Sequence, residues 1–109
     1  MTGCSSDLQV APEAYRGPAL SQETLNKSYL VVAETPGAGW AIEIDATRKS
    51  ADGTDVYLTL RRPNPVGAYA ADPVEQRVLT RVSTERPLRL FARVANYGSD
   101  DEQVYKRVR

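Results

Sequence analysis

The chain has 109 residues, a formal net charge of zero, no histidine and one cysteine, Cys4. This length fits one domain, and a hydrophobic fraction of 41% argues against disorder. Without histidine, the commonest general base and the commonest metal ligand are both missing, which excludes histidine-dependent catalysis and zinc sites built from cysteine and histidine. We therefore expect a protein that is not an enzyme and that carries no cofactor and no metal.

Charge is distributed unevenly along the chain. Residues 1–60 hold four basic and eight acidic side chains, whereas residues 61–109 hold ten and six. Such an asymmetry can place charge on one face of a fold, but it does not make a basic tail. With no net charge, we expect no nucleic-acid partner.

The N-terminal segment is small, polar and interrupted by prolines, and we predict that residues 1–18 form a flexible tether ahead of a domain at residues 19–109. Its run Thr2-Gly3-Cys4-Ser5-Ser6-Asp7 resembles the end of a bacterial lipoprotein signal, in which the cysteine receives lipid. Met1 stands where that signal usually has leucine. The resemblance implies a lipid on Cys4 and a periplasmic or cell-surface location. The alternative is a disordered N-terminus with an isolated thiol.

Residues 19–28 fit no single element, although Ser21 could cap a short helical turn that runs to Leu25. From residue 29 the hydrophobic residues follow the period of a β-strand, first as a short apolar run at 29–33 that ends in the turn-rich segment 35–39. No apolar run approaches the roughly 20 residues of a membrane-spanning helix, so we expect membrane contact only through the lipid.

Two alternating runs predict a β-hairpin between Trp40 and Arg61, with a turn at Asp52-Gly53, a pair that favours positive φ. One face of the hairpin is apolar and the other is polar or mixed. The residues predicted to face inward are Trp40, Ile42, Ile44, Ala46, Val56, Leu58 and Leu60, and those predicted to face outward are Ala41, Glu43, Asp45, Thr47, Tyr57, Thr59 and Arg61.

The remaining elements are a loop and three strands. Three prolines and a glycine make residues 62–73 a loop or ragged edge, because proline removes a donor from the hydrogen-bond ladder. Strands follow at 76–83, at 88–94 beyond a turn at 85–87, and at 104–108. Five to seven short strands separated by turns favour a sandwich or a small barrel, and we predict an all-β fold, a small antiparallel Ig-like β-sandwich.

Residues 29–94 resemble the small Ig-like C-terminal domain of the PrcB family, which is associated with a bacterial surface protease complex. The resemblance rests on Pro36-Gly37-Ala38-Gly39-Trp40 leading into an alternating strand, on prolines between Pro63 and Pro65, and on a strand that opens with Gln76. It implies a non-catalytic lipoprotein domain that binds or assembles with a protein partner through its loops. Over the loops of this fold as a whole, the residues that we predict to contact the partner are Pro36, Gly37, Gly39, Trp40, Asn64, Pro65, Tyr69, Arg86 and Pro87.

A second resemblance is to the chagasin type of cysteine-protease inhibitor, which fills a protease cleft with three loops. Thr35 to Trp40 is similar to one of these loops, and Arg86-Pro87-Leu88 is similar to another but lacks its tryptophan. This gives an alternative function, a protease inhibitor that acts through both segments. Trp40 has an alternative role as a core residue, because it shares the inward parity of Ile42.

Four arginines form the last candidate site. If the strands at 76–83 and 88–94 pair with each other, Arg77 and Arg81 share a face with Arg89 and Arg93. Such a basic face could bind an acidic protein, an anionic glycan or lipid headgroups. The alternative is a solvated face whose arginines pair with nearby carboxylates, which is common and contributes little energy.

Overall fold

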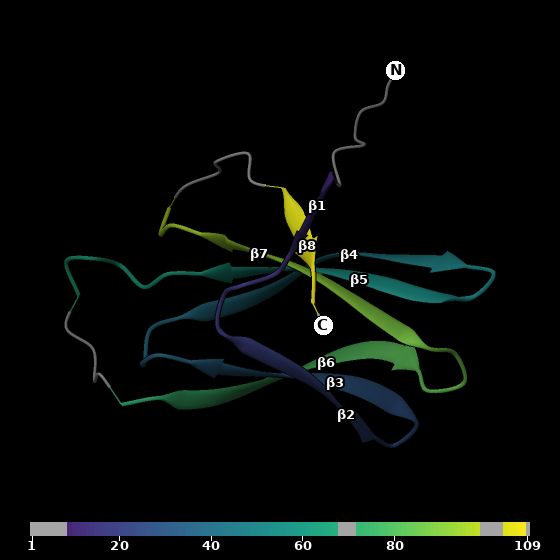
Figure 1. Cartoon of the computed structure of the whole chain (residues 1–109). Coiled ribbons are helices and arrows are strands. Elements are labelled where there is room, and N and C mark those ends of the chain that lie inside the picture. Colours follow the sequence, from purple (N-terminus) through teal and green to yellow (C-terminus); the bar gives the residue numbers. More distant parts are fainter. Residues whose placement is uncertain (1–8, 68–71, 99–103, 109) are drawn as a thin grey trace.

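The computed structural model describes residues 9–67, 72–98 and 104–108, and these residues form eight β-strands in two facing sheets (Figure 1). The strands are β1 (Val10–Ala14), β2 (Ala19–Leu25), β3 (Ser28–Thr35), β4 (Ala41–Ser50), β5 (Gly53–Arg61), β6 (Val74–Ser83), β7 (Leu88–Ala95) and β8 (Tyr105–Arg107). One sheet has the order β1-β8-β7-β5-β4 and the other β2-β3-β6. The predicted all-β class is confirmed, and the arrangement is sandwich-like. Within the described ranges, no helix is long and apolar enough to cross a membrane.

The sequence predicted a purely antiparallel sandwich, and the structure corrects this. β1 pairs with β8 and β5 pairs with β7 in parallel, whereas the other paired strands are antiparallel. After β5 the chain crosses to the three-stranded sheet as β6 and then returns to the five-stranded sheet as β7. A parallel pair needs such a crossover, because its second strand must start at the same end as the first.

Two strands lie where none was predicted. β1 occupies part of the segment expected to be a flexible tether, and it is joined to β8 by hydrogen bonds from Tyr105 N to Gln9 O (2.8 Å) and from Tyr15 N to Arg107 O (2.9 Å). The tether expectation is therefore wrong for residues 10–14. β2 replaces the expected helical turn and pairs with β3 along its whole length.

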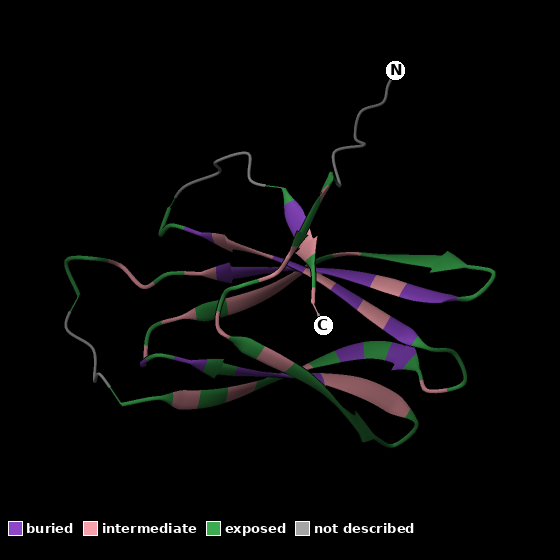
Figure 2. Cartoon of the chain, in the orientation of Figure 1, coloured by how far each residue is buried: buried purple, intermediate pink, exposed green. Residues whose placement is uncertain are grey.

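The β2–β3 connection explains why a strand forms at residues 19–25. Asn26 and Lys27 have φ values of 50° and 66°. Two central residues with positive φ make the tight hairpin turn that matches the twist of the flanking strands, and asparagine is among the residues that favour it. Both β1 and β2 are edge strands with mostly exposed side chains (Figure 2), so neither shows the apolar period of a buried strand.

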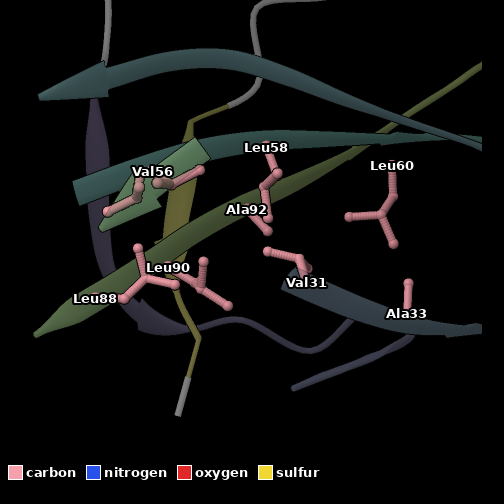
Figure 3. Packing of buried hydrophobic residues seen from close by; sticks show 9 residues of the cluster. Val31, Ala33, Val56, Leu58, Leu60, Leu88, Leu90 and Ala92 are labelled. Carbon is pink, nitrogen blue, oxygen red and sulfur yellow. The ribbon is translucent and has the colours of Figure 1, made fainter. Parts of the chain in front are cut away.

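The hydrophobic core fills the space between the sheets, and its aliphatic side chains point toward one another (Figure 3). The buried cluster comprises Val31, Ala33, Val56, Leu58, Leu60, Val82, Leu88, Leu90 and Ala92. The predicted inward positions of β5 are thus confirmed. Trp40, Ile42 and Ile44 are only partly buried and pack against the edge of this cluster.

A β-bulge at Asp45 reverses the predicted alternation in the second half of β4. Ile44 pairs with Leu58, but Ala46 pairs with Tyr57, so β4 has one extra residue, Asp45, at this point. Because paired residues share a face, Ala46 lies on the outer face with Tyr57, and Thr47 lies on the inner face with Val56. The predicted inward position of Ala46 is wrong for this reason.

Gly53 brings the β4–β5 turn against the β6–β7 turn. Its φ is 157°, and a Cβ atom at this position would lie 2.9 Å from the carbonyl oxygen of Pro87. That same oxygen accepts a hydrogen bond from Thr54 N at 2.9 Å. The predicted turn at Asp52-Gly53 is confirmed, and its glycine is required by the close approach of a second turn.

Candidate functional site

The connections between strands gather at two opposite ends of the sandwich (Figure 1). The first end, the loop end, holds the connections that follow β3 and β5. The start of β6 lies beside the β3–β4 connection there, because Thr35 pairs with Val74 and Gln76 Nε2 donates a hydrogen bond to Trp40 O at 3.0 Å. The second end, the turn end, holds the connections that follow β4 and β6. The start of β3 also lies at this end, where Tyr29 Oη donates a hydrogen bond to Arg86 O at 2.7 Å. The eight residues of β3 separate the two ends by about 26 Å, at the usual rise of a β-strand.

At the loop end, the β3–β4 connection is held by buried polar contacts. The Thr35 hydroxyl, fully buried, lies 2.9 Å from the carbonyl oxygen of Val74 and 3.2 Å from that of Gly37. Gly39 has a φ of 93°, which glycine adopts without strain. Of the predicted contact residues here, Pro36 and Gly39 are exposed, whereas Gly37 is buried.

Trp40 is half-buried against the core, with the Arg62 guanidinium 5.9 Å from the centre of its ring. This position fits the core role that was weighed for Trp40 more closely than that of a projecting contact residue. The contact between Trp40 and Arg62 also joins the two loops of this end, since Arg62 begins the β5–β6 connection.

The β5–β6 connection begins with a tight turn. Asn64 Oδ1 accepts a hydrogen bond from Val66 N, and Asn64 O accepts one from Gly67 N, both at 3.0 Å. Asparagine favours such turns because its side chain bonds the backbone two residues ahead. The turn presents Pro65 and Val66 to solvent, and Val66 is 89% exposed. Tyr69, also a predicted contact residue, lies outside the described residues, as does Cys4.

Arg86 and Pro87 do not join this group. They lie at the turn end, the length of β3 away from Pro36 and Trp40. The inhibitor hypothesis needs Thr35–Trp40 and Arg86–Leu88 to enter one cleft together. Because the two segments lie at opposite ends of the sandwich, they cannot enter one protease cleft together in this structure.

The predicted arginine stripe is not formed. Arg77 and Arg81 lie on β6 and Arg89 and Arg93 on β7, and these strands belong to different sheets. Their short connection suggested a hairpin, but the chain crosses between layers there. Arg77 makes ion pairs with Glu75 at 2.6 Å and with Glu23 at 3.5 Å.

Arg89 and Arg93 instead lie on the outer face of the five-stranded sheet and bond to polar groups there. Arg89 pairs with Asp55 at 2.5 Å and with Asp52 at 3.2 Å. These hydrogen bonds lower the pKa of the Asp52 carboxyl and raise that of the Arg89 guanidinium. Arg93 Nε donates to Thr59 Oγ1 at 2.8 Å.

A polar cluster lies beside Arg93 on this face. The bulge residue Asp45 accepts hydrogen bonds from the Thr59 hydroxyl and, at 2.8 Å, from Tyr105 Oη. Burial and this hydrogen bond raise the pKa of Tyr105 to about 12. The Arg93 guanidinium covers the Tyr105 ring at 4.9 Å.

Tyr57 faces outward as predicted and completes this layer, but neighbouring side chains cover it and leave it only 6% exposed. Its ring stacks on Phe91 at 5.1 Å and meets Tyr105 edge-on at 5.2 Å, and Arg48 lies over it at 5.9 Å. Stacked rings and arginine side chains cover one another here, as amphipathic side chains do on sheet surfaces. Because its polar groups bond one another, this face holds the sheet together and offers few groups to a ligand.

A hollow of about 490 Å³ opens at the turn end, between the last part of β4, the start of β5 and the end of β6. Three cations line it, Lys49, Arg81 and Arg86, together with one carboxylate, Glu85. The hydroxyl side chains that line it are Thr47, Thr54, Thr80 and Ser83. The structure therefore brings together Arg81 from the predicted stripe and Arg86 from a predicted contact loop.

A second hollow, of about 530 Å³, lies beside β8 and is lined by Tyr15, Gly17 and several cations, among them Arg93. Arg93 also donates a hydrogen bond to Thr59 Oγ1 on the outer face of the sheet. Among the described residues, no group of three or more histidine, cysteine, aspartate or glutamate side chains could hold a metal ion.

Sequence reasoning did not find the hollow because its residues come from three separate segments. Lys49 and Thr47 reach the inner face only because the bulge at Asp45 reverses their parity. The one visible signal was the basic pair Arg48-Lys49 at the end of a strand, which belongs equally to a solvated edge.

Comparison with known proteins identifies no relative: no protein-family model, no curated protein and no solved structure matches this chain.

Proposed function

We propose that this chain is a non-catalytic binding module of the Ig-like kind, held at the outer side of a bacterial membrane by a lipid on Cys4, that recognises a protein partner with its loop end. The observation that carries the proposal is the turn at Asn64, which presents Val66 almost fully to solvent on a hydrogen-bonded scaffold. Many cell-surface domains share the Ig-like sandwich architecture without sharing one strand order. The PrcB resemblance makes a protease complex the first partner to test.

The chemistry of the loop end suits a protein partner. Pro36, Pro65 and Val66 expose apolar surface without charge on two loops that Trp40 and Arg62 join. Prolines and internal hydrogen bonds restrict these loops before binding, which reduces the ordering cost of association. Loops positioned by a rigid β-scaffold are a usual place for recognition.

The proposal is tested by site-specific crosslinking. A photo-crosslinking amino acid replaces Val66 in one variant and Ala51, which is exposed at the turn end, in a matched control. In an envelope extract of the native host, position 66 should capture one partner protein and position 51 should not. Equal capture at both positions, or none, contradicts the loop end as the interface.

Two further measurements separate the parts of the proposal. Val66→Asp should weaken the captured interaction at least tenfold and leave the unfolding midpoint unchanged, with Ala51→Asp as the control. Metabolic labelling with a fatty-acid analogue should mark the full-length protein from its native gene but not its Cys4→Ser variant. Absence of label would remove the lipid anchor while leaving the interface to be judged by crosslinking.

A further inference from the structure

The cations of the turn-end hollow differ from Arg77 and Arg89 in forming no ion pair with a carboxylate of the described residues. In the described part of the chain, no ion pair forms at Lys49, Arg81 or Arg86, although Arg77 and Arg89 each pair with two acidic side chains. Three cations line this hollow against a single carboxylate, Glu85, which forms an ion pair with none of them, and the cations therefore repel one another. An anion in the hollow would relieve that repulsion.

The backbone holds Arg81 at the rim of this hollow. Between the pairs Ser28–Ser83 and Leu30–Leu79, β3 contributes one residue and β6 contributes three, so β6 bulges at Arg81. Arg81 has a φ of 62°, an uncommon conformation for a residue with a side chain. The Thr80 hydroxyl closes the bulge by donating to Tyr29 O at 2.9 Å and accepting from Val82 N at 3.1 Å. Bulges of this kind redirect a side chain out of the ladder.

The other groups are also positioned in advance. Arg86 Nη1 donates to Ser50 O at 2.8 Å, which fixes one edge of its guanidinium and leaves further N–H groups for a ligand. Thr54 is only 2% exposed and lines the hollow, and its hydroxyl makes no hydrogen bond to any described residue. A buried hydroxyl without a partner costs free energy unless a ligand or water supplies one.

We propose that this hollow is a binding site for a phosphate monoester, whose phosphate group contacts Lys49, Arg81 and Arg86. Three cations and Glu85 give the site a net charge of about +2, which complements a phosphate monoester carrying −1.5 to −2 at neutral pH. Guanidinium groups match the geometry of phosphate oxygens and bond them in pairs. A volume of about 490 Å³ falls within the range of small-molecule sites and leaves room for an organic group beyond the phosphate. The site lies at the opposite end from the proposed protein interface and stands independently of it.

The first test is titration of the protein with O-phosphoserine, followed by NMR amide shifts and calorimetry. Shifts should concentrate at Lys49, Thr54, Thr80 and Arg81, and serine should cause none. Shifts spread evenly over all basic residues, or no binding, would overturn the proposal.

Variants of the hollow and a matched control sharpen that test. Arg81→Asn combined with Arg86→Gln should weaken O-phosphoserine binding at least tenfold, and asparagine is chosen because it tolerates positive φ. Arg77→Gln is the control, since Arg77 is an exposed arginine on the same strand and is paired away from the hollow. Equal weakening by the control would contradict a built site. Circular dichroism of each variant shows that the fold is retained, and Lys49→Gln alone provides a second variant if the double variant does not fold.

The absence of histidine gives a further test by pH. No side chain of this protein has an ordinary pKa between pH 5 and 7, whereas a phosphate monoester loses its second proton near pH 6. Affinity for O-phosphoserine should therefore fall several-fold from pH 7 to pH 5, and affinity for a sulfate ester should stay constant. An equal response of both ligands would overturn the preference for phosphate.

A final comparison identifies where the phosphate comes from. Phosphatidylcholine vesicles with and without phosphatidic acid are tested beside O-phosphoserine. Binding only to vesicles that contain phosphatidic acid assigns a lipid headgroup, and binding only to O-phosphoserine assigns a soluble ester; both support the phosphate site. If vesicle binding persists in the double variant, the headgroup assignment fails.

Discussion

At the scale of single residues, stability depends on where each side chain sits relative to the two sheets. Leu58 is fully buried between them, whereas Ile44, opposite it on β4, is only partly buried at the edge of the core. Both are aliphatic and both were predicted to face inward. The cost of truncating them should nevertheless differ, because it grows with the cavity left behind.

Leu58→Ala should therefore lower the free energy of unfolding by about 2–5 kcal/mol, within the usual range for a buried leucine. Ile44→Ala should cost clearly less, since solvent can fill part of the space. Urea denaturation of both variants measures this, with the exposed Val66→Ala as the control. A larger loss at Ile44 than at Leu58 would contradict the described packing.

The second residue-scale prediction concerns alkaline pH. Burial and the hydrogen bond to Asp45 favour the neutral form of Tyr105 and raise its pKa to about 12, above its ordinary value near 10. The neutral phenol thus stabilises the fold fully below pH 10, and this contribution is lost as the pH rises through about 12.

Tyr105→Phe should flatten the fall in unfolding free energy between pH 10 and pH 12, because phenylalanine cannot ionise. Burial also raises the pKa of Tyr15 and Tyr57, so a part of the fall should remain. Urea unfolding at pH values from 8 to 12 provides the measurement, and Tyr97→Phe, which removes an exposed hydroxyl, is the matched control. An identical pH profile for wild type and Tyr105→Phe would refute the assignment.

At the scale of elements, the sequence predicts best the strands whose two faces differ. The hairpin of β4 and β5 was recognised from its alternation and from Asp52-Gly53, and its turn lies where expected. β1 and β2 were missed because exposed edge strands bury little and leave no apolar period to detect. The bulges at Asp45 and Arg81 were missed for another reason: a bulge is fixed by the partner strand, which a local pattern does not contain.

β1 yields the element-scale prediction. A chain that starts at Ala19 lacks β1 and also Tyr15, whose hydroxyl donates to Pro18 O at 2.8 Å and whose ring packs against the core. Compared with a chain that starts at Gln9, it should unfold at a midpoint lower by about 5 °C or more, the shift expected for roughly 1 kcal/mol in a domain of this size. Calorimetry of the two chains measures this, and equal midpoints would restore the view of this segment as a tether.

At the scale of the whole molecule, the arrangement of the two sheets was the least predictable feature. A short link between two strands usually predicts a hairpin, since consecutive strands are neighbours about two times in three. The link from β6 to β7 departs from that rule and changes sheet, so the four predicted arginines are divided between two layers. The two candidate sites also differ in how far the sequence predicts them. The loop end contains a turn that was predicted from the sequence, whereas the hollow depends on contacts between distant segments.

The parallel pairing of β1 with β8 determines how the molecule responds to mechanical force. In a parallel pair, the start of one strand and the end of the other lie at opposite ends, so a pull on both chain termini slides the strands along each other. Hydrogen bonds such as Tyr105 N to Gln9 O and Tyr15 N to Arg107 O are then loaded together instead of opening one by one. In a force microscope, the unfolding force should be higher when the chain is pulled by its termini than when it is pulled at Ala19 and Glu34. Ala19 and Glu34 pair at the open end of the β2–β3 hairpin, so this second pull breaks the hydrogen bonds one after another. If Cys4 carries the proposed lipid, a pull between the membrane and the C-terminal strand would therefore load the β1–β8 pair in shear.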